Sequence, residues 1–266
     1  MPADSSVQAE VTRFSKNAAP LTNTDSLAVE EPLEIRVLGQ AIAVTMRTPG
    51  HDEELAAGFL LTEGILKRRT DIVEIAHCRV EPAATLTGNI LNVFLAPDVE
   101  LDLDRLTRHV FSASSCGLCG KASIESVHQQ FAPLQKPLEI PLQTLLALPP
   151  KLRAAQKTFD STGGLHAAGL FTSNGELLVA REDIGRHNAV DKVLGHAFFN
   201  DSLPLSDHIL MVSGRASFEI LQKALAAGIR CIAAVSAPSS LAVDFARESN
   251  QSLYAFVRET SANRYA

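Results

Sequence analysis

Two cysteines, Cys116 and Cys119, flank Gly117 and Leu118 and are followed by Gly120. Two thiols this close can chelate a metal ion, interconvert with a disulfide, or hold a sulfane sulfur as a persulfide. The Ser and Ala residues before the pair and the glycines within it predict a loop that leads into a helix over residues 121–130. A persulfide carrier needs an exposed thiolate on a loop that is free to meet both donor and acceptor, and this loop suits that chemistry.

Two other chemistries stay open for the cysteine pair. A structural zinc ion would need about two more ligands, and the sequence offers no second Cys-x-x-Cys and no histidine pair at finger spacing. The fold would have to supply those ligands from the residues His77, Cys78, His128 and Cys231. Thioredoxin-like exchange would place the pair after a buried strand, and the upstream Ser and Ala residues do not resemble one. We predict no permanently held metal.

A second group of charged and hydrogen-bonding residues lies between Ala180 and Lys192, where a strand is expected to end and a helix to begin. Ligands of open α/β sheets bind at such positions, and a helix N-terminus favours an anion such as phosphate. Arg186 and His187 are therefore candidate ligand-binding residues. The structural alternative is that Asp183 caps the helix, that Arg186, Asp191 and Lys192 form its solvated face, and that His187 is a partly buried histidine.

Two further strand-to-helix turns carry small polar residues. Ser213-Gly214-Arg215 follows an expected strand and could hold phosphate oxygens through backbone N–H groups and the Arg215 cation, although an ordinary turn capped by Ser217 explains it equally well. Ser236–Ser240 repeats the arrangement more weakly, and Gly163-Gly164 with His166 lies close to the start of another strand. Because these turns are expected on one edge of one sheet, together they predict a cleft.

The elements that position these residues follow from apolar periodicity. In the first half, the pattern predicts a β-hairpin over residues 33–45 that turns at Gly39-Gln40, a helix over 52–66, strands over 72–80 and 89–95, and a helix over 103–110. After a helix broken at Pro149-Pro150, strands are expected at 165–171, 177–180, 209–212, 231–235 and 253–257, with helices at 186–199, 218–227 and 241–248. This alternation predicts a layered α/β sheet with helices on its faces.

Composition separates the chain into three parts. Residues 1–28 mix Pro, Ser, Thr, Asn and Asp with isolated apolar residues, and predict a mobile tail without the apolar core of a signal peptide. Residues 29–136 predict a small α+β region that ends in the Cys-x-x-Cys loop, and residues 137–266 the α/β domain. A net charge of −6 argues against nucleic-acid or membrane binding, and no apolar stretch reaches the length of about 20 residues that a spanning helix needs. We expect a cytoplasmic protein.

The chain resembles the formate dehydrogenase accessory sulfurtransferases, the FdhD-type proteins, from Glu30 to Arg258. The motifs that carry the resemblance are Gly58–Gly64, Ser115–Lys121, Thr162–His166, Asp183–Lys192 and Ser213–Arg215. Among them, the Asp-x-Gly-Arg-His-Asn-Ala run is far more specific than the cysteine pair.

The resemblance implies that a cysteine desulfurase loads sulfur onto Cys116, with Cys119 as the alternative or a helper, and that the sulfur passes to the molybdenum bis(molybdopterin guanine dinucleotide) cofactor of the formate dehydrogenase catalytic subunit. The family's cofactor-binding segment corresponds here to Phe256, Val257, Arg258, Glu259, Thr260 and Ser261, and we expect Arg186, His187 and Arg215 to contribute. A homodimer is also implied. The rival class is a cofactor chaperone whose cysteines are structural or metal-binding.

The family fold is similar to that of cytidine deaminases, so we expect a cytidine-deaminase-like three-layer α/β/α domain beside a smaller N-terminal α+β region. Zinc deaminases need His-x-Glu followed by Pro-Cys-x-x-Cys. His51-Asp52-Glu53 has the first spacing, but Pro-Cys-x-x-Cys is absent, because Ser115 precedes the pair Cys116 and Cys119. Deamination is therefore excluded despite the shared architecture.

Overall fold

The computed structural model describes residues 4–78, 88–99 and 124–266. Its largest sheet has six strands in the order β12-β11-β10-β9-β7-β8. The three central strands β9, β10 and β11 are parallel, whereas β7 runs antiparallel to β8 and β9, and β12 antiparallel to β11. The bounds are β7 His166–Thr172, β8 Leu177–Asp183, β9 His208–Val212, β10 Cys231–Ala234, β11 Ser252–Ala255 and β12 Asn263–Arg264.

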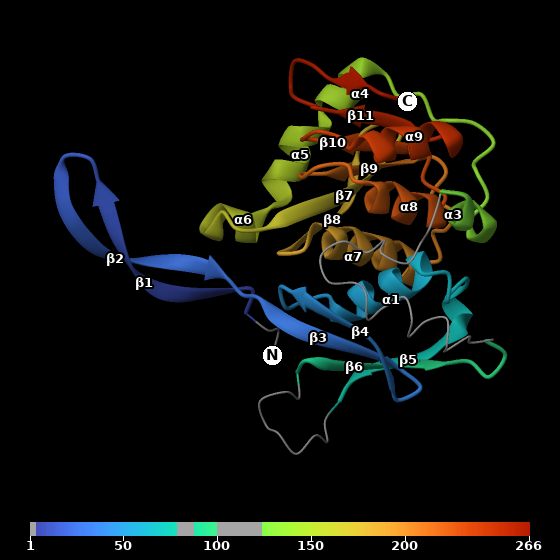
Figure 1. Cartoon of the computed structure of the whole chain (residues 1–266), viewed down its shortest axis with the longest axis horizontal. Coiled ribbons are helices and arrows are strands. Elements are labelled where there is room, and N and C mark those ends of the chain that lie inside the picture. Colours follow the sequence, from blue (N-terminus) through green and yellow to red (C-terminus); the bar gives the residue numbers. More distant parts are fainter. Residues whose placement is uncertain (1–3, 79–87, 100–123) are drawn as a thin grey trace.

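Helices cover both faces of this sheet (Figure 1). Alternate strand residues point to opposite faces, so Ala168 and Leu170 join one buried cluster with α7, α8 and α9, while Ala167 and Phe171 join a second with α4 and α5. The bounds are α4 Leu142–Leu146, α5 Leu148–Ala155, α6 Lys157–Thr162, α7 Arg186–Phe199, α8 Phe218–Ala226 and α9 Ser240–Glu248. The predicted layered α/β sheet is thus confirmed.

A second sheet of four strands, in the order β4-β3-β6-β5, lies beside the first. The predicted hairpin is present, since β3 and β4 pair antiparallel and turn at Leu38 and Gly39, both with positive φ. Helix α1 connects this region to the large sheet. The bounds are β3 Glu31–Val37, β4 Gln40–Arg47, α1 Asp52–Thr62, the short 3-10 helix η1 Arg69–Asp71, β5 Ile72–His77, β6 Ile90–Leu95 and α3 Ile124–Gln130.

Helices α1 and α7 cross at close range, and two glycines make this possible. A Cβ on Gly58 would lie 1.9 Å from the backbone oxygen of Asp191, and a Cβ on Gly195 would lie 1.8 Å from that of Glu54. Either contact is far inside van der Waals range, so only glycine fits. Because of this crossing, one hydrophobic cluster continues from the small sheet to the large one. The division near residue 137 stays a prediction.

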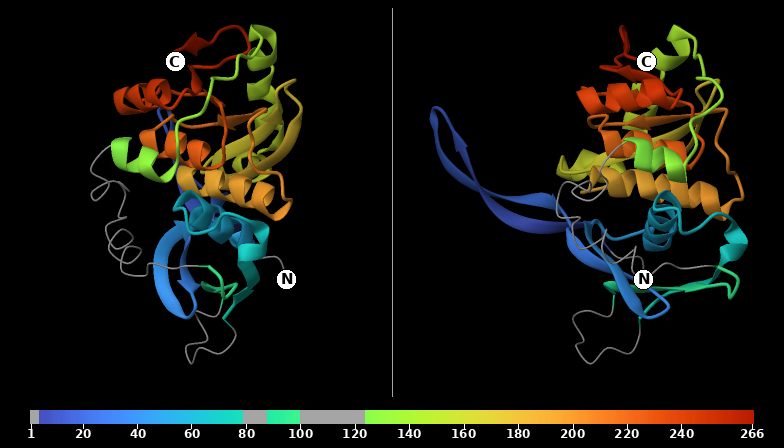
Figure 2. Two further views of the ribbon diagram at one scale, coloured as in Figure 1. Left: turned by 90° about the vertical axis from the view of Figure 1, so that its right-hand side faces the viewer. Right: turned by 45° about the vertical axis from the view of Figure 1, so that its right-hand side comes forward.

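Residues expected to form a tail instead form a β-hairpin. Strands β1 (Ser6–Ser15) and β2 (Ala18–Ala28) pair antiparallel and project away from the rest of the chain (Figures 1 and 2). In β1 the residues Val7, Ala9 and Val11 are spaced two apart, as in a strand, whereas the apolar residues of β2 are scattered among polar ones, so the segment has the composition of a loop. The segment therefore holds two paired strands, and its mobility stays a prediction.

Smaller differences concern element ends. The predicted break is present two residues earlier, because α4 ends at Leu146 and α5 begins at Leu148 with Pro149-Pro150 in its first turn, where a proline costs no hydrogen bond. Helix α1 stops at Thr62 because Gly64 adopts a positive φ that ends the helix. The helix expected over residues 103–110 lies outside the described residues. None of the helices in the described part of the chain is long and apolar enough to cross a membrane.

Candidate functional site

The predicted polar turns gather on one edge of the six-stranded sheet. Strands β8, β9 and β10 end at this edge and β7 begins there, because β7 and β8 are antiparallel partners and β7 runs against β9. A cleft of about 1150 Å³ opens at this edge and is lined by His166, Arg186, Ser213, Gly214, Arg215 and Ser236. The turns that the sequence singled out therefore lie around one cavity. Helices α5 and α6 form its other wall.

Two cations in this cleft have no counterion among the described residues. Neither Arg186 nor Arg215 makes a hydrogen bond or ion pair in residues 4–78, 88–99 and 124–266, and the Nε of Arg186 is buried. A buried N–H donor without an acceptor is costly, and a bound anion would remove that cost. The cleft also offers the backbone of the Ser213-Gly214 turn, where small residues let a ligand approach closely. The arrangement suits a phosphate-bearing ligand.

His166 lines the same cleft as these two cations. Burial lowers the pKa of its imidazole, and the nearby charges of Arg186, His187 and Arg215 lower it further, against a weaker opposing effect from Asp183. A Cβ on Gly214 would be 3.3 Å from the Nδ1 of His166, so the turn packs tightly on the ring. The imidazole is therefore favoured in its neutral form inside an electropositive cavity.

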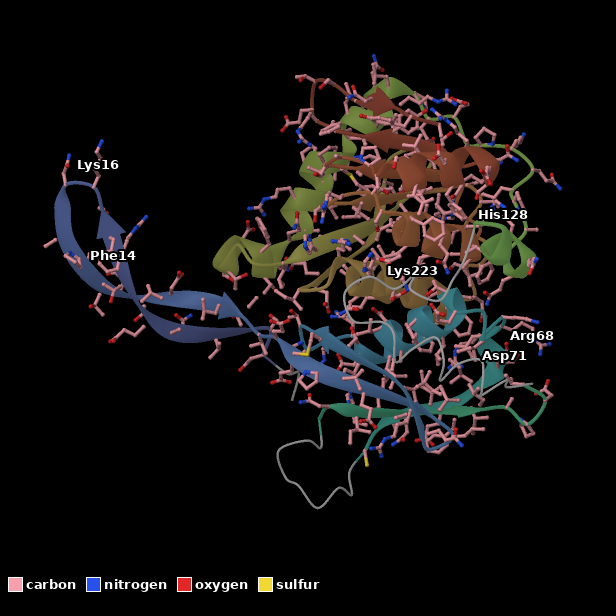
Figure 3. All side chains as sticks on the ribbon, in the orientation of Figure 1. Phe14, Lys16, Arg68, Asp71, His128 and Lys223 are labelled. Carbon is pink, nitrogen blue, oxygen red and sulfur yellow. The ribbon has the colours of Figure 1, made fainter. Side chains whose placement is uncertain are left out.

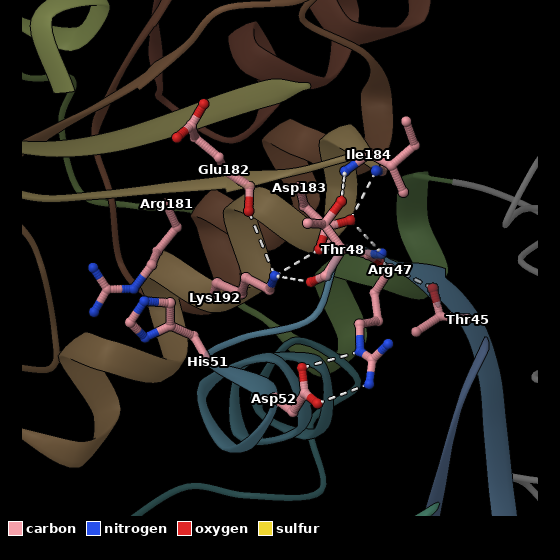
Figure 4. Close-up of polar contacts among 12 residues, drawn as sticks. Thr45, Arg47, Thr48, His51, Asp52, Arg181, Glu182, Asp183, Ile184 and Lys192 are labelled. Carbon is pink, nitrogen blue, oxygen red and sulfur yellow. Dashed lines mark hydrogen bonds and ion pairs between the residues drawn. The ribbon is translucent and has the colours of Figure 1, made fainter. Parts of the chain in front are cut away.

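The remainder of the Asp183–Lys192 run clasps the protein together (Figure 4). Lys192 and Asp183 are both buried, with Nζ 2.7 Å from Oδ2. Lys192 also donates to the backbone oxygen of Thr48 at 2.8 Å, and the backbone N–H of Thr48 donates to Asp183 at 3.2 Å. Asp183 additionally accepts from the backbone of Gly185 at 2.8 Å. These bonds tie the turn after β4 to the start of α7.

Asn188 and Asp191 extend the same clasp. The side-chain amide of Asn188 donates to Asp183 at 2.9 Å and to the backbone of Met46 at 2.7 Å. Asp191 accepts from the ammonium of Lys223 at 2.8 Å. Asp191 and Lys192 are buried, so the alternative that placed them on a solvated helix face is wrong for these two residues. Asp183 does not cap α7, whose N-cap is Gly185 without a side-chain cap; its carboxylate accepts from the backbone of Gly185 and the side chain of Asn188.

His187 points away from the cleft toward α8. Its Nε2 lies 2.6 Å from Oε2 of Glu219 and 3.3 Å from Oγ of Ser217. Burial acts to raise the pKa of the Glu219 carboxyl, but the hydrogen bond with His187 and its charge outweigh burial, and the pKa lies below its ordinary value. His187 therefore orders the turn between β9 and α8, which carries Ser213–Arg215.

The C-terminal segment follows β11 at the same sheet edge. Glu259 lines the cleft, whereas the side chain of Val257 is fully buried. The guanidinium of Arg258 donates to the backbone oxygens of Val235 and Val257. Phe256 is partly exposed with a positive φ, and Thr260 and Ser261 are exposed. The segment borders the cleft, and the guanidinium of Arg258, which the resemblance places in the cofactor-binding segment, is bonded to the main chain.

Cys116 and Cys119 lie outside the described residues. The chain re-enters the described part at α3, where His128 bonds Ser249 at 2.9 Å and stacks on Phe245. Helix α9 begins at the cleft edge and ends just before Ser249, so α3 lies near the opposite edge of the sheet. Seven residues separate Cys116 from Ile124 in sequence, and an extended chain over the eight steps between them reaches at most about 28 Å.

The residues considered as zinc ligands do not meet in the described part of the chain, where no group of three or more His, Cys, Asp or Glu side chains could hold a metal. Cys231 is buried in β10, and burial raises the pKa of its thiol. The cleft wall includes Arg153, Phe159 and Asp160, which sequence reasoning missed. Arg153 pairs with Asp160 at 2.5 Å, and no spacing in the sequence signals this pair because it links two short helices.

Comparison with known proteins agrees with this architecture. A family model described as the FdhD/NarQ family matches residues 28–266. The chain is 55% identical to the sulfur carrier protein FdhD of Mycobacterium tuberculosis, over 92% of this chain and 91% of the relative. It is 51% identical to the sulfur carrier protein FdhD of Streptomyces coelicolor, over 94% of this chain and 90% of the relative.

Among solved structures, a formate dehydrogenase accessory protein from Desulfotalea psychrophila is similar. The two chains superpose with a TM-score of 0.76 at 26% identity, over 98% of this chain and 97% of the other. The matched residues 28–266 include all the strands and turns that build the cleft. The chain belongs to the FdhD/NarQ family.

Proposed function

We propose that this protein is a sulfur carrier that accepts sulfur from a cysteine desulfurase as a persulfide on Cys116 and transfers it to the molybdenum bis(molybdopterin guanine dinucleotide) cofactor during formate dehydrogenase maturation. The observation that carries the proposal is the cleft with two unpaired arginines in the described residues, in a chain whose relatives are named sulfur carriers. The cofactor is the substrate of this reaction, and the protein acts as a sulfurtransferase.

The cleft has the size and chemistry that this substrate requires. Its volume of about 1150 Å³ exceeds the range of about 300–1000 Å³ that is usual for small-molecule sites. Guanine dinucleotides carry diphosphates, and Arg186 and Arg215 supply planar guanidinium donors that match phosphate oxygens. We place the phosphates against these two side chains and the Ser213-Gly214 backbone. The segment from Phe256 to Ser261 then borders the bound nucleotide.

The choice of cysteine rests on accessibility. Cys231 is buried and its raised pKa disfavours the thiolate that attacks sulfur. Cys116 stands among small residues ahead of α3, and Lys121 or the N-terminus of the following helix would stabilise its thiolate. Cys119 is proposed as a helper. The desulfurase converts free cysteine to alanine and holds the sulfur as its own persulfide. The Cys116 thiolate attacks the outer sulfur of that persulfide, and the desulfurase cysteine leaves as a thiolate. The outer sulfur of the Cys116 persulfide then passes to the cofactor as a sulfur atom, and Cys116 returns to its thiolate.

Further parts of the proposal concern setting and architecture. We place the protein in the cytoplasm as a homodimer that meets the desulfurase and the catalytic subunit of formate dehydrogenase in turn. We also propose that the domain over residues 137–266 is related to the cytidine deaminases in its layering. The three-layer arrangement of α4 and α5, the six-stranded sheet, and α7 to α9 supports that relation.

The rival function is a chaperone that binds the cofactor and presents it to the dehydrogenase, with the cysteines shaping a loop. Formate dehydrogenase activity in cells that lack their own family member separates the two. A Cys116→Ala variant that still binds GDP is expected to lose all maturation activity, while Cys78→Ala keeps it. If the Cys116→Ala protein supports maturation at near the normal level, the carrier function is refuted and the chaperone is favoured.

A further inference from the structure

His166 is the one histidine among the described residues that line the cleft. It is half-buried and opens β7, at the edge of the sheet where Arg186 and Arg215 lie. Its two ring nitrogens make no hydrogen bond or ion pair with the residues that the structure describes. The side chain therefore offers hydrogen-bonding groups to the cleft beside the two arginines.

The turn after β9 holds this ring in place. The hydroxyl of Ser213 accepts from the backbone N–H of Ala167 at 2.9 Å, and the backbone oxygen of Ala167 accepts from the N–H of Ser213 at 2.9 Å. These two bonds fix the turn beside His166, where a Cβ on Gly214 would lie 3.3 Å from Nδ1 and 3.6 Å from Cε1 of the ring. The imidazole is thus packed against the same backbone that we place against the phosphates.

The environment of His166 disfavours a positive charge on the ring. The charged or titratable groups that act on the ring or line the same cleft are Arg186 and His187 on α7, Arg215 after β9, Asp183 on β8, Arg153 on α5, Asp160 on α6 and Glu259 after β11. Arg153 and Asp160 pair with each other, and Asp183 pairs with Lys192. Burial lowers the pKa of His166, and the nearby positive groups lower it further. The free protein therefore keeps this imidazole neutral above about pH 6.5.

A bound anion reverses this balance. A diphosphate is negatively charged, and an opposite charge within a few ångströms shifts the pKa of a titratable group by about one to three units toward its charged form. The phosphate oxygens are also acceptors, and a protonated histidine donates from both ring nitrogens. A diphosphate in the cleft therefore favours the imidazolium that the free protein disfavours.

We propose that His166 is a ligand-binding residue of this cleft that takes up a proton when a diphosphate binds and then donates a hydrogen bond to it. This role rests on the proposed function in one respect, the placement of nucleotide diphosphates in the cleft. The proton adds a third cation that forms only in the complex. The affinity for the ligand is then highest at low pH and declines as pH rises through the pKa that His166 has in the complex.

Two opposite pH trends separate this role from a structural one. In the free protein, the lowered pKa of His166 makes the free energy of unfolding fall as pH drops. In the complex, the same proton strengthens binding, so the affinity for a diphosphate should rise as pH drops. A histidine that only packs against the turn would give the first trend without the second.

Isothermal titration calorimetry of the full chain with GDP-mannose tests the proposal. Each phosphate of this probe carries a sugar ester, so neither titrates near neutral pH, whereas the terminal phosphate of GDP has a pKa of about 6. We expect binding to be about threefold or more tighter at about pH 6 than at about pH 8. A comparison of buffers with different ionisation enthalpies should show an uptake of about 0.2 to 1 proton per ligand near about pH 6.5.

His166→Gln keeps an N–H donor but carries no group that titrates near neutral pH. Its affinity for GDP-mannose is expected to vary less than about 1.5-fold over the same pH range, with no proton uptake. His128→Gln is the matched control and should keep the pH dependence of the unmodified chain. His128 bonds Ser249 beyond the end of α9 and lies well away from α5 and α6 (Figure 3). Circular dichroism checks that both variants fold.

The measurement on the unmodified chain decides the proposal even if a variant fails to fold. Binding of GDP-mannose without proton uptake would overturn the role of His166 and leave the phosphates in the cleft. An absence of binding at every pH would overturn both the role of His166 and the placement of the phosphates. A folded His166→Gln protein with an unaltered pH dependence would assign the proton to another group and also overturn the proposal.

Discussion

Replacing Lys192 by methionine tests whether the Asp183–Lys192 run is a structural clasp. Methionine keeps the length of the buried stem and removes the charge, which leaves the Asp183 carboxylate buried without its partner at 2.7 Å. Breaking a buried ion pair in this way costs about 3–5 kcal/mol. Asp183 keeps hydrogen bonds from the backbone of Thr48 and Gly185 and from the side chain of Asn188. We therefore expect the lower part of that range, about 3 kcal/mol.

Urea denaturation followed by circular dichroism measures the free energy of unfolding. The double variant Asp183→Asn/Lys192→Met removes both charges, so its loss is expected to fall short of the summed single losses by about 2 kcal/mol. Arg186→Met is the matched control from the same run. It removes a cation without a counterion among the described residues and should lower the free energy of unfolding by less than about 0.5 kcal/mol. A loss below about 1 kcal/mol for Lys192→Met refutes the clasp.

The remaining predictions concern ligand binding, helix packing and pH. Arg186→Met and Arg215→Met should each weaken GDP binding by about tenfold to a hundredfold in calorimetry. An undiminished affinity for GDP in both variants would refute the placement of the phosphates in the cleft. Gly195→Ala brings a Cβ to 1.8 Å from a backbone oxygen of α1 and should lower the free energy of unfolding by at least about 1–3 kcal/mol, measured by thermal unfolding. Gly88→Ala, whose Cβ would have nothing within 4 Å, should lower it far less. Equal losses of stability in the two variants would refute the close crossing of α1 and α7. Because the folded protein lowers the pKa of His166, the unfolded chain binds that proton more tightly, and the free energy of unfolding should fall as pH drops through about 6.5. In His166→Gln this fall should be smaller, and an unchanged pH profile would contradict the assigned environment.

The large sheet was predictable because each of its elements carries its own apolar pattern. The stripe of Val190, Val193, Leu194 and Ala197 predicts α7 with the ends that it has in the structure, and strands β9 to β11 appear as short apolar runs between turns. The polar turns at the ends of these strands predicted the cleft, because parallel neighbours end on the same edge of a sheet. Arg186 and Arg215 do line one cavity.

The clasp and the ribbon were not predictable for a different reason. From the sequence, Lys192 and Asp191 are expected on the surface, because their partners Thr48 and Lys223 lie far away along the chain. Lys192 and Asp191 are buried only because α1 crosses over α7. His187 likewise depends on Glu219, 32 residues later. Neither strand of the ribbon has a buried residue. The sequence therefore lacks the regular alternation of apolar and polar residues that predicts a strand.

The central claim is that Cys116 carries sulfur, and intact-protein mass spectrometry tests it most directly. The reduced full chain is incubated with a cysteine desulfurase and cysteine, and peptide mapping then locates any added sulfur. We expect the mass of one sulfur atom on Cys116, with Cys231 unmodified as an internal control because its thiol is buried and its pKa raised. A folded protein that gains no sulfur on either Cys116 or Cys119 would contradict the claim.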